Sequence, residues 1–182
     1  MKKPDIRISV FIATSLDGFI ARPDGDVSWL DGYEPMGEGE DGGYGEFFNA
    51  IDVMVMGRGT FEKVLTFDWP YGDKPITIMS SSLTEVPEKL KASVRIDSAA
   101  PQQLLKKLET EGYRHIYLDG GKVIQSFLQE GLVDDMTLTI IPVLLGRGIP
   151  LFSPLEKDVK LKLLKSRSWK NGFTQSNYLV MK

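Results

Sequence analysis

Cysteine is absent from this sequence of 182 residues. Its absence excludes a disulfide framework, a thiolate nucleophile and a zinc or iron–sulfur site with cysteine ligands. Histidine occurs once, as His115, so a site that needs two or three imidazoles is excluded as well. We therefore expect a protein without a metal centre.

Long hydrophobic runs and long basic runs are missing too. The formal net charge of −3 argues against nucleic acid or an acidic membrane surface as the main partner. The apolar run at residues 10–13 follows a basic start at residues 1–5, but it is far too short for the core of a signal peptide, and nothing approaches a membrane span. We expect a cytoplasmic protein with one domain, residues 1–182.

The order of the hydrophobic patterns predicts an α/β fold with a mixed sheet. Strands are expected at residues 6–13, 52–56, 76–79, 115–118 and 136–145, with Pro142 inside the last strand. Helices are expected at residues 98–112, capped by Ser98 and ended by Gly112, and at residues 121–131. Residues 23–45, rich in glycine and acidic residues, predict a long loop. Asn171-Gly172, between two strand-like runs, predicts a C-terminal hairpin.

Two junctions share one design, in which an apolar strand passes through a glycine turn into a helix. They lie at residues 56–61 and 118–123. Glycine lets a phosphate group approach the backbone, and the free N–H groups at a helix start favour its negative charge. Arg58 adds a cation that suits the extra phosphate of NADP. The alternative, that the glycines only make turns, stays open because neither segment matches the usual dinucleotide or P-loop pattern.

Several motifs follow one another along the chain. They are residues 13–21 (ATSLDGFIA), 55–62 (VMGRGTFE), 119–124 (DGGKVI), 131–134 (GLVD), 138–142 (LTIIP) and 146–152 (GRGIPLF). In this order they resemble the motifs of the reductase domain of riboflavin biosynthesis, and the second is also similar to the strand–Gly-Arg-x-Thr–helix motif of dihydrofolate reductases. The resemblance covers nearly the whole chain.

This resemblance implies a dihydrofolate-reductase-like three-layer fold, with a central mixed, mostly parallel sheet and an antiparallel C-terminal hairpin. It implies NADPH bound across the carboxyl ends of the strands, with Arg58 and Ser80 facing the 2′-phosphate and the glycine turns facing the pyrophosphate. The residues that would line the cofactor are Ala13, Gly57, Arg58, Thr60, Ser80, Ser81, Gly120, Gly121, Lys122, Val123 and Ile124. It also implies a homodimer.

The implied activity is reduction of a pyrimidine- or pterin-like heterocycle, most like that of 5-amino-6-(5-phosphoribosylamino)uracil reductase. The residues expected to bind the substrate are Asp17, Trp29, Tyr44, Phe48 and Thr139. Trp29 and Phe48 could stack on a flat ring or belong to the core, and Asp17 could be a turn residue only. No catalytic residue is assigned. Glu46 could donate a proton if burial raised its pKa, and otherwise it lies on a solvated helix face.

Two departures from the dihydrofolate reductases count against dihydrofolate as the substrate. Tyr44 stands where those enzymes carry an acidic residue on the helix after the long loop, and Asp73 stands where they use an arginine for the glutamate tail. Dihydrofolate reductase, a reductase of some other heterocycle and a non-catalytic NADPH-binding module remain as alternatives.

Overall fold

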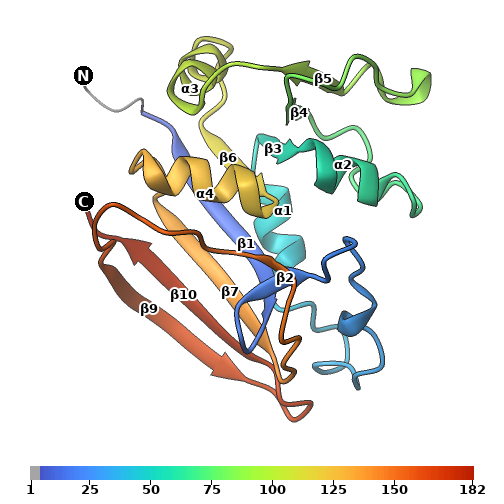
Figure 1. Ribbon diagram of the computed structural model, residues 1–182, viewed down its shortest axis with the longest axis vertical. Coiled ribbons are helices and arrows are strands. Elements are labelled where there is room, and N and C mark those ends of the chain that lie inside the picture. The colour runs from blue at the N-terminus through green and yellow to red at the C-terminus, as the bar shows by residue number, and fades with distance from the viewer. Residues whose placement is uncertain (1–4) are drawn as a thin grey trace.

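The computed structural model describes residues 5–182, so the basic start of the chain, considered as a targeting signal, lies mostly outside the described residues. An eight-stranded sheet with the strand order β5-β4-β3-β6-β1-β7-β10-β9 forms the centre (Figure 1). Its strands are β1 (Arg7–Ser15), β3 (Val53–Gly57), β4 (Ile76–Met79), β5 (Val94–Asp97), β6 (His115–Asp119), β7 (Asp135–Ile141), β9 (Leu161–Ser168) and β10 (Thr174–Val180). Two short strands, β2 (Phe19–Ala21) and β8 (Ile149–Pro150), pair with each other beside it.

The sheet is mixed and mostly parallel. Strands β5, β4, β3, β6, β1 and β7 run parallel to their neighbours, whereas β10 pairs antiparallel with both β7 and β9. The helices are α1 (Tyr44–Ala50), α2 (Arg58–Val64), α3 (Pro101–Thr110) and α4 (Gly121–Gln129). Side chains of α3 and α4 pack on one face of the sheet and those of α1 and α2 on the other, which gives three layers. The predicted fold class is confirmed.

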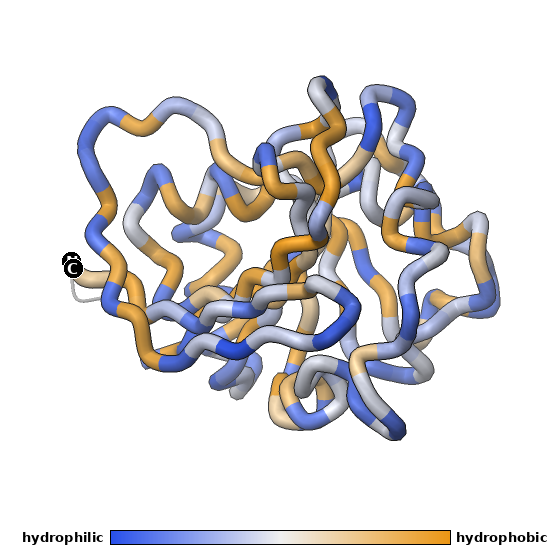
Figure 2. Tube along the Cα trace, turned by 90° about the horizontal axis from the view of Figure 1, so that it is seen from below, coloured by the Kyte–Doolittle hydropathy of each residue, from blue (hydrophilic) through white to orange (hydrophobic). Residues whose placement is uncertain are grey.

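Strand β3 shows why a continuous apolar run predicted a strand covered on both sides. Successive side chains of a strand point to opposite faces. Val53 and Val55 accordingly lie in the core cluster that contains α3 and α4, whereas Met54 and Met56 lie in the cluster that contains Phe61 of α2. In Figure 2 the central strands are largely hydrophobic, and hydrophilic segments gather in the outer loops.

The predicted C-terminal hairpin is present, but the strand predicted at residues 136–145 is too long. Gly172 has a φ of +89°, a conformation that favours glycine, and the Trp169 N–H donates to the Phe173 carbonyl at 2.9 Å to close the turn. Strand β7 ends at Ile141, because Pro142 has no N–H for the sheet and the Val143 N–H bends back to the Ile141 carbonyl at 2.8 Å.

Other details of the local predictions are wrong. Helix α3 starts at Pro101 after Ala100, and Ser98 does not cap it. The carboxylate of Asp97 instead accepts the Ala99 N–H at 2.8 Å and fixes the approach to the helix. Strands β2, β5 and β8 were not predicted, since two to four residues carry too little pattern. Within residues 5–182, none of the helices combines the length and apolarity that crossing a membrane requires.

Candidate active site

The two glycine turns meet at the carboxyl ends of adjacent parallel strands. Met56 of β3 pairs with Asp119 of β6, so Gly57 and Gly120 follow side by side. A Cβ on Gly120 would lie 2.3 Å from the Thr60 hydroxyl and 3.9 Å from the Gly57 nitrogen, and its φ of +90° also favours glycine. Three of the predicted cofactor residues, Gly57, Thr60 and Gly120, are therefore in close contact.

The first turn of α4 holds four further predicted residues in different surroundings. Lys122 is exposed, whereas Val123 and Ile124 face the core, and the Ile124 N–H already donates to the Gly120 carbonyl at 3.0 Å. The first N–H groups of a helix have no partner inside it. Gly121 serves packing as well, because a Cβ there would lie 2.9 Å from the Pro150 carbonyl oxygen.

The predicted phosphate-binding residues that follow β3 and β4 also lie together. The guanidinium of Arg58 donates to the Ser82 hydroxyl at 3.1 Å and makes an exposed ion pair with Glu62 at 3.4 Å. The Ser80 hydroxyl accepts the backbone N–H of Ser82 at 3.2 Å, which shapes this turn, and Ser81 is exposed on it. Ser82 was missed by the sequence prediction, although it continues the same run of serines.

Asp17 and Trp29, two of the predicted substrate residues, make contacts inside the protein. Both carboxylate oxygens of Asp17 are occupied, since they accept the Ser15 hydroxyl at 2.6 Å and the N–H groups of Leu145 at 3.1 Å and Gly146 at 2.7 Å. These hydrogen bonds lower the pKa of Asp17, the one from Ser15 most, and they fasten the loop after β7 to the turn after β1. Trp29 is 6% exposed and packs in a small cluster with Ile141 and Phe173, so its ring lies in the core.

Thr139 and Ala13 pair across β7 and β1. The buried Thr139 hydroxyl accepts the side-chain amide of Gln175 at 2.9 Å, and the same amide donates to the Gly42 carbonyl at 3.1 Å. Gln175 was not predicted, because its role depends on the register between β10 and β7. It ties the start of α1 to the sheet.

The most chemically distinctive group at this edge of the sheet is Asp119, at the end of β6. It opens the motif at residues 119–124, but nothing in the sequence indicated that its carboxyl is buried. One of its carboxylate oxygens accepts the Gly120 N–H at 2.8 Å. A small part of the residue stays accessible, but protein surrounds the carboxyl, and this burial raises its pKa to about 6.

The charge of Asp119 affects the pKa values of three tyrosines. Burial first, and the Asp119 charge second, raise the pKa of Tyr44 to about 12 and the pKa values of Tyr71 and Tyr117 further still. The phenols therefore stay neutral and can donate hydrogen bonds. Tyr44 stands where dihydrofolate reductases carry an acidic residue, but the charge of a carboxylate still acts at this point, and it comes from β6 and not from helix α1.

Aromatic rings line the same region. Tyr44 and Phe48, four residues apart on α1, stack with their ring centroids 5.7 Å apart, and Phe48 lies 5.9 Å from the ring of Tyr71. The Lys74 ammonium lies 4.9 Å above the Phe48 ring and donates to the Ile51 carbonyl at 2.8 Å. Two predicted substrate residues thus lie together, beside a carboxyl that can hold a proton and phenols that can donate hydrogen bonds.

Comparison with known proteins gives concordant results. The family model of the RibD C-terminal domain matches residues 7–174. The chain is 38% identical to the uncharacterized protein YwjB of Bacillus subtilis (strain 168) over 85% of this chain and 87% of that one. It is 31% identical to the uncharacterized protein YyaP of the same organism over 94% of each chain.

Solved structures show the same likeness. A protein from Shewanella sp. PV-4 that carries a riboflavin-biosynthesis name is 37% identical, with a TM-score of 0.91 over 97% of this chain and 100% of that chain. The diaminohydroxyphosphoribosylaminopyrimidine deaminase/5-amino-6-(5-phosphoribosylamino)uracil reductase of Thermotoga maritima is 17% identical, with a TM-score of 0.72. This chain covers 57% of that longer protein, and at this identity the likeness concerns the fold alone.

Proposed function

We propose that this chain, which belongs to the RibD C-terminal domain family, is an NADPH-dependent reductase of a flat nitrogen heterocycle. The observation that carries the proposal is the meeting of Gly57, Thr60 and Gly120 at the carboxyl ends of two adjacent strands. Ligands of open α/β sheets bind outside the carboxyl ends of the strands, where the chain offers free N–H groups.

The residues present fit a phosphorylated dinucleotide. The start of α4 offers backbone N–H groups for a pyrophosphate. Arg58, about half exposed, stands with the Ser80 and Ser82 hydroxyls at the next strand end, where a further phosphate would find a cation and hydroxyl donors. When bound, NADPH supplies a hydride, and the protein supplies placement and electrostatics.

Asp119 is the group that we assign to proton transfer. A general acid works best when its pKa lies near the working pH, and burial brings the pKa of Asp119 to about 6. The neutral hydroxyls of Tyr44 and Tyr71 would orient the ring nitrogens and carbonyl oxygens of a substrate. The faces of Phe48 and Tyr44 suit a flat ring.

The substrate that these features support best is a pyrimidine, as in 5-amino-6-(5-phosphoribosylamino)uracil reductase. The test is NADPH oxidation, followed by absorbance, with this ribosylaminopyrimidine and with dihydrofolate at matched concentrations. We expect faster turnover of the pyrimidine, because Asp73 is exposed and offers no cation to a glutamate tail. Efficient turnover of dihydrofolate would move dihydrofolate reductase into first place. No turnover of either substrate, together with tight NADPH binding, would favour a non-catalytic NADPH-binding module.

A further inference from the structure

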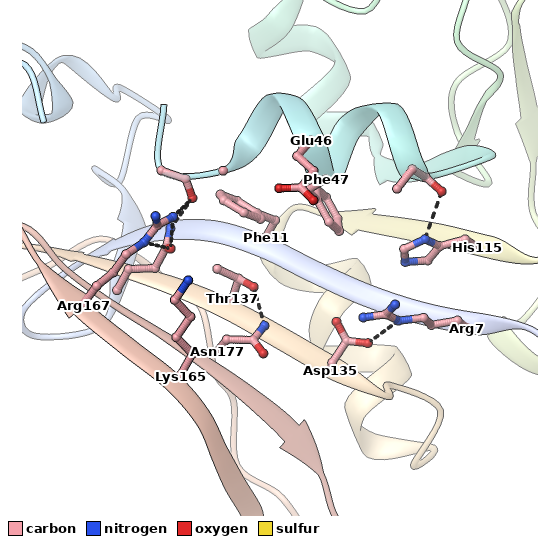
Figure 3. Close-up of a pocket in the computed structure, with 14 residues that line it drawn as sticks. Arg7, Phe11, Glu46, Phe47, His115, Asp135, Thr137, Lys165, Arg167 and Asn177 are labelled. Atoms are coloured by element: carbon pink, nitrogen blue, oxygen red, sulfur yellow. Dashed lines mark hydrogen bonds and ion pairs between the residues drawn. The ribbon is translucent and has the colours of Figure 1, made fainter. Parts of the chain in front are cut away.

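A groove of about 440 Å³ lies between helix α1 and the sheet (Figure 3). Its walls come from α1 with the two glycines before it and from strands β1, β6, β7, β10 and β9. Glu46, Phe47 and Ala50 of α1 line this groove, whereas Tyr44 and Phe48 do not, and the Phe47 ring also packs against Tyr117 with the centroids 5.0 Å apart. Glu46, considered above as a proton donor, lines the groove, but none of the residues predicted to bind cofactor or substrate does, so the groove is distinct from the candidate active site.

Three cationic side chains with unused donors line the groove. The Lys165 ammonium makes no hydrogen bond or ion pair with the described part of the chain and points into the groove (Figure 3). Arg167 uses its Nε and one terminal nitrogen on the Gln175 amide oxygen and the Gly42 carbonyl, which leaves its other terminal nitrogen for a ligand. Arg7, at the far end, donates from its Nε to Asp135 at 2.8 Å and keeps both terminal nitrogens free of the described residues.

The position of Arg7 is set by a hydrogen-bonded network beneath it. The Asp135 carboxylate is 8% exposed, and the oxygen that binds Arg7 also accepts the Ser9 hydroxyl at 3.0 Å. Ser9 in turn contacts the His115 ring at 2.8 Å, and the other ring nitrogen lies 3.2 Å from the Ala50 carbonyl. The Arg7 side chain itself is 60% exposed, and an exposed ion pair adds little to stability, so the main effect of this network is to fix the guanidinium at the groove.

Acceptors and an aromatic wall complete the groove. Glu46 makes no hydrogen bond or ion pair with residues 5–182 and stands opposite the cations of β9. The Asn177 amide nitrogen donates to the Thr137 hydroxyl at 2.7 Å, which leaves the Asn177 amide oxygen as a fixed acceptor. The half-buried rings of Phe11 and Phe47 lie 5.0 Å apart between these polar groups.

We propose that this groove binds a flat heteroaromatic ring that carries one carboxylate and ring N–H groups. Three cations and two carboxylates line the groove, which leaves one net positive charge when His115 is neutral, and this matches a monoanion better than a phosphate dianion. The carboxylate would lie at Lys165 between the two arginines, the ring against Phe11 and Phe47, and the ring N–H groups would face Glu46 and Asn177. A volume of this size is typical of sites for small molecules.

The test uses orotate, a pyrimidine with one carboxylate and two ring N–H groups, and isothermal titration calorimetry on the full chain. We expect saturable binding of orotate, and weaker binding of uracil, which lacks the carboxylate, and of benzoate, which lacks the N–H groups. Lys165→Met should weaken orotate binding by about tenfold or more, because a charge-assisted contact is lost. Lys162→Met is the matched control, since Lys162 lies on the same strand, is also exposed and does not line the groove.

Two further measurements distinguish orotate binding in the groove from binding in the candidate active site and from pairing of two chains. Asp119→Asn should leave orotate binding unchanged. If Asp119→Asn loses orotate binding and Lys165→Met keeps it, orotate binds in the candidate active site, and the proposal is overturned. Light scattering tests whether a second copy of the chain fills the groove. A dimer that Lys165→Met dissociates would make the groove an interface and would also overturn the proposal. The absence of saturable orotate binding would overturn it as well.

Discussion

Replacing Asp119 with asparagine tests both the buried charge and the proposed proton donor. Burial raises the pKa of Asp119 from an ordinary value of 3.8 to about 6. The folded state therefore binds more protons than the unfolded state between these two values. The stability that Asp119 contributes is fully present below the unfolded pKa and is lost as the pH rises through about 6. At neutral pH the ionised carboxylate thus destabilises the fold.

The expected magnitude follows from the size of this shift. A shift of roughly two pKa units corresponds to about 3 kcal/mol at neutral pH, and the small accessible part of the residue lowers this to about 1.5–3 kcal/mol. An asparagine oxygen can still accept the Gly120 N–H. Asp119→Asn should therefore be more stable than the wild type by this amount at about pH 7.5, and the gap should shrink by about 1–2 kcal/mol at about pH 4.5.

Urea unfolding of both proteins at the two pH values measures this difference, and other titrating groups cancel in the comparison. The same variant should lose about 10²–10⁴-fold in turnover, because an amide cannot deliver the proton. A gap in stability that does not depend on pH would refute the buried-charge argument. Full turnover by a folded Asp119→Asn protein would refute the assignment of the proton donor, whatever the stability shows.

Three other predictions follow from single sites. Arg58→Ala should remove a preference for NADPH over NADH of about tenfold, measured by fluorescence titration of both cofactors, and an unchanged preference would speak against a phosphate at this arginine. Gly121→Ala should lower the free energy of unfolding by about 1–3 kcal/mol, because its Cβ meets the Pro150 carbonyl at 2.9 Å, whereas the control Gly59→Ala, with nothing within 4 Å, should not. Burial lowers the pKa of His115. The stability that the neutral His115 ring contributes should therefore be present above about pH 6.5 and lost as the pH falls. His115→Gln should lack this part of the pH dependence in urea unfolding, and a variant with the wild-type profile would contradict it.

The sequence predicted those parts of the fold that depend on local pattern. The run at residues 52–56 is apolar at every position except its first, so both faces of that strand had to be covered. Asn171-Gly172 predicted a turn that needs a positive φ, which Gly172 supplies. The end of β7 was missed because Ile141 and the residues after Pro142 are alike in hydropathy, and only the hydrogen bond of Val143 back to Ile141 separates strand from loop.

The site residues that were missed depend on contacts between distant segments. Asp119 resembles an ordinary turn residue in the sequence, and only the fold buries it and brings its charge close enough to raise the pKa values of Tyr44 and Tyr71, far away in the sequence. Helix α1 shows the same limit most clearly. Tyr44 and Glu46 are two residues apart, and the helical period sends them to opposite sides, one toward Asp119 and the other toward the groove. The sequence offered both as candidates for one site, because periodicity fixes which residues share a helix face but not what each face meets.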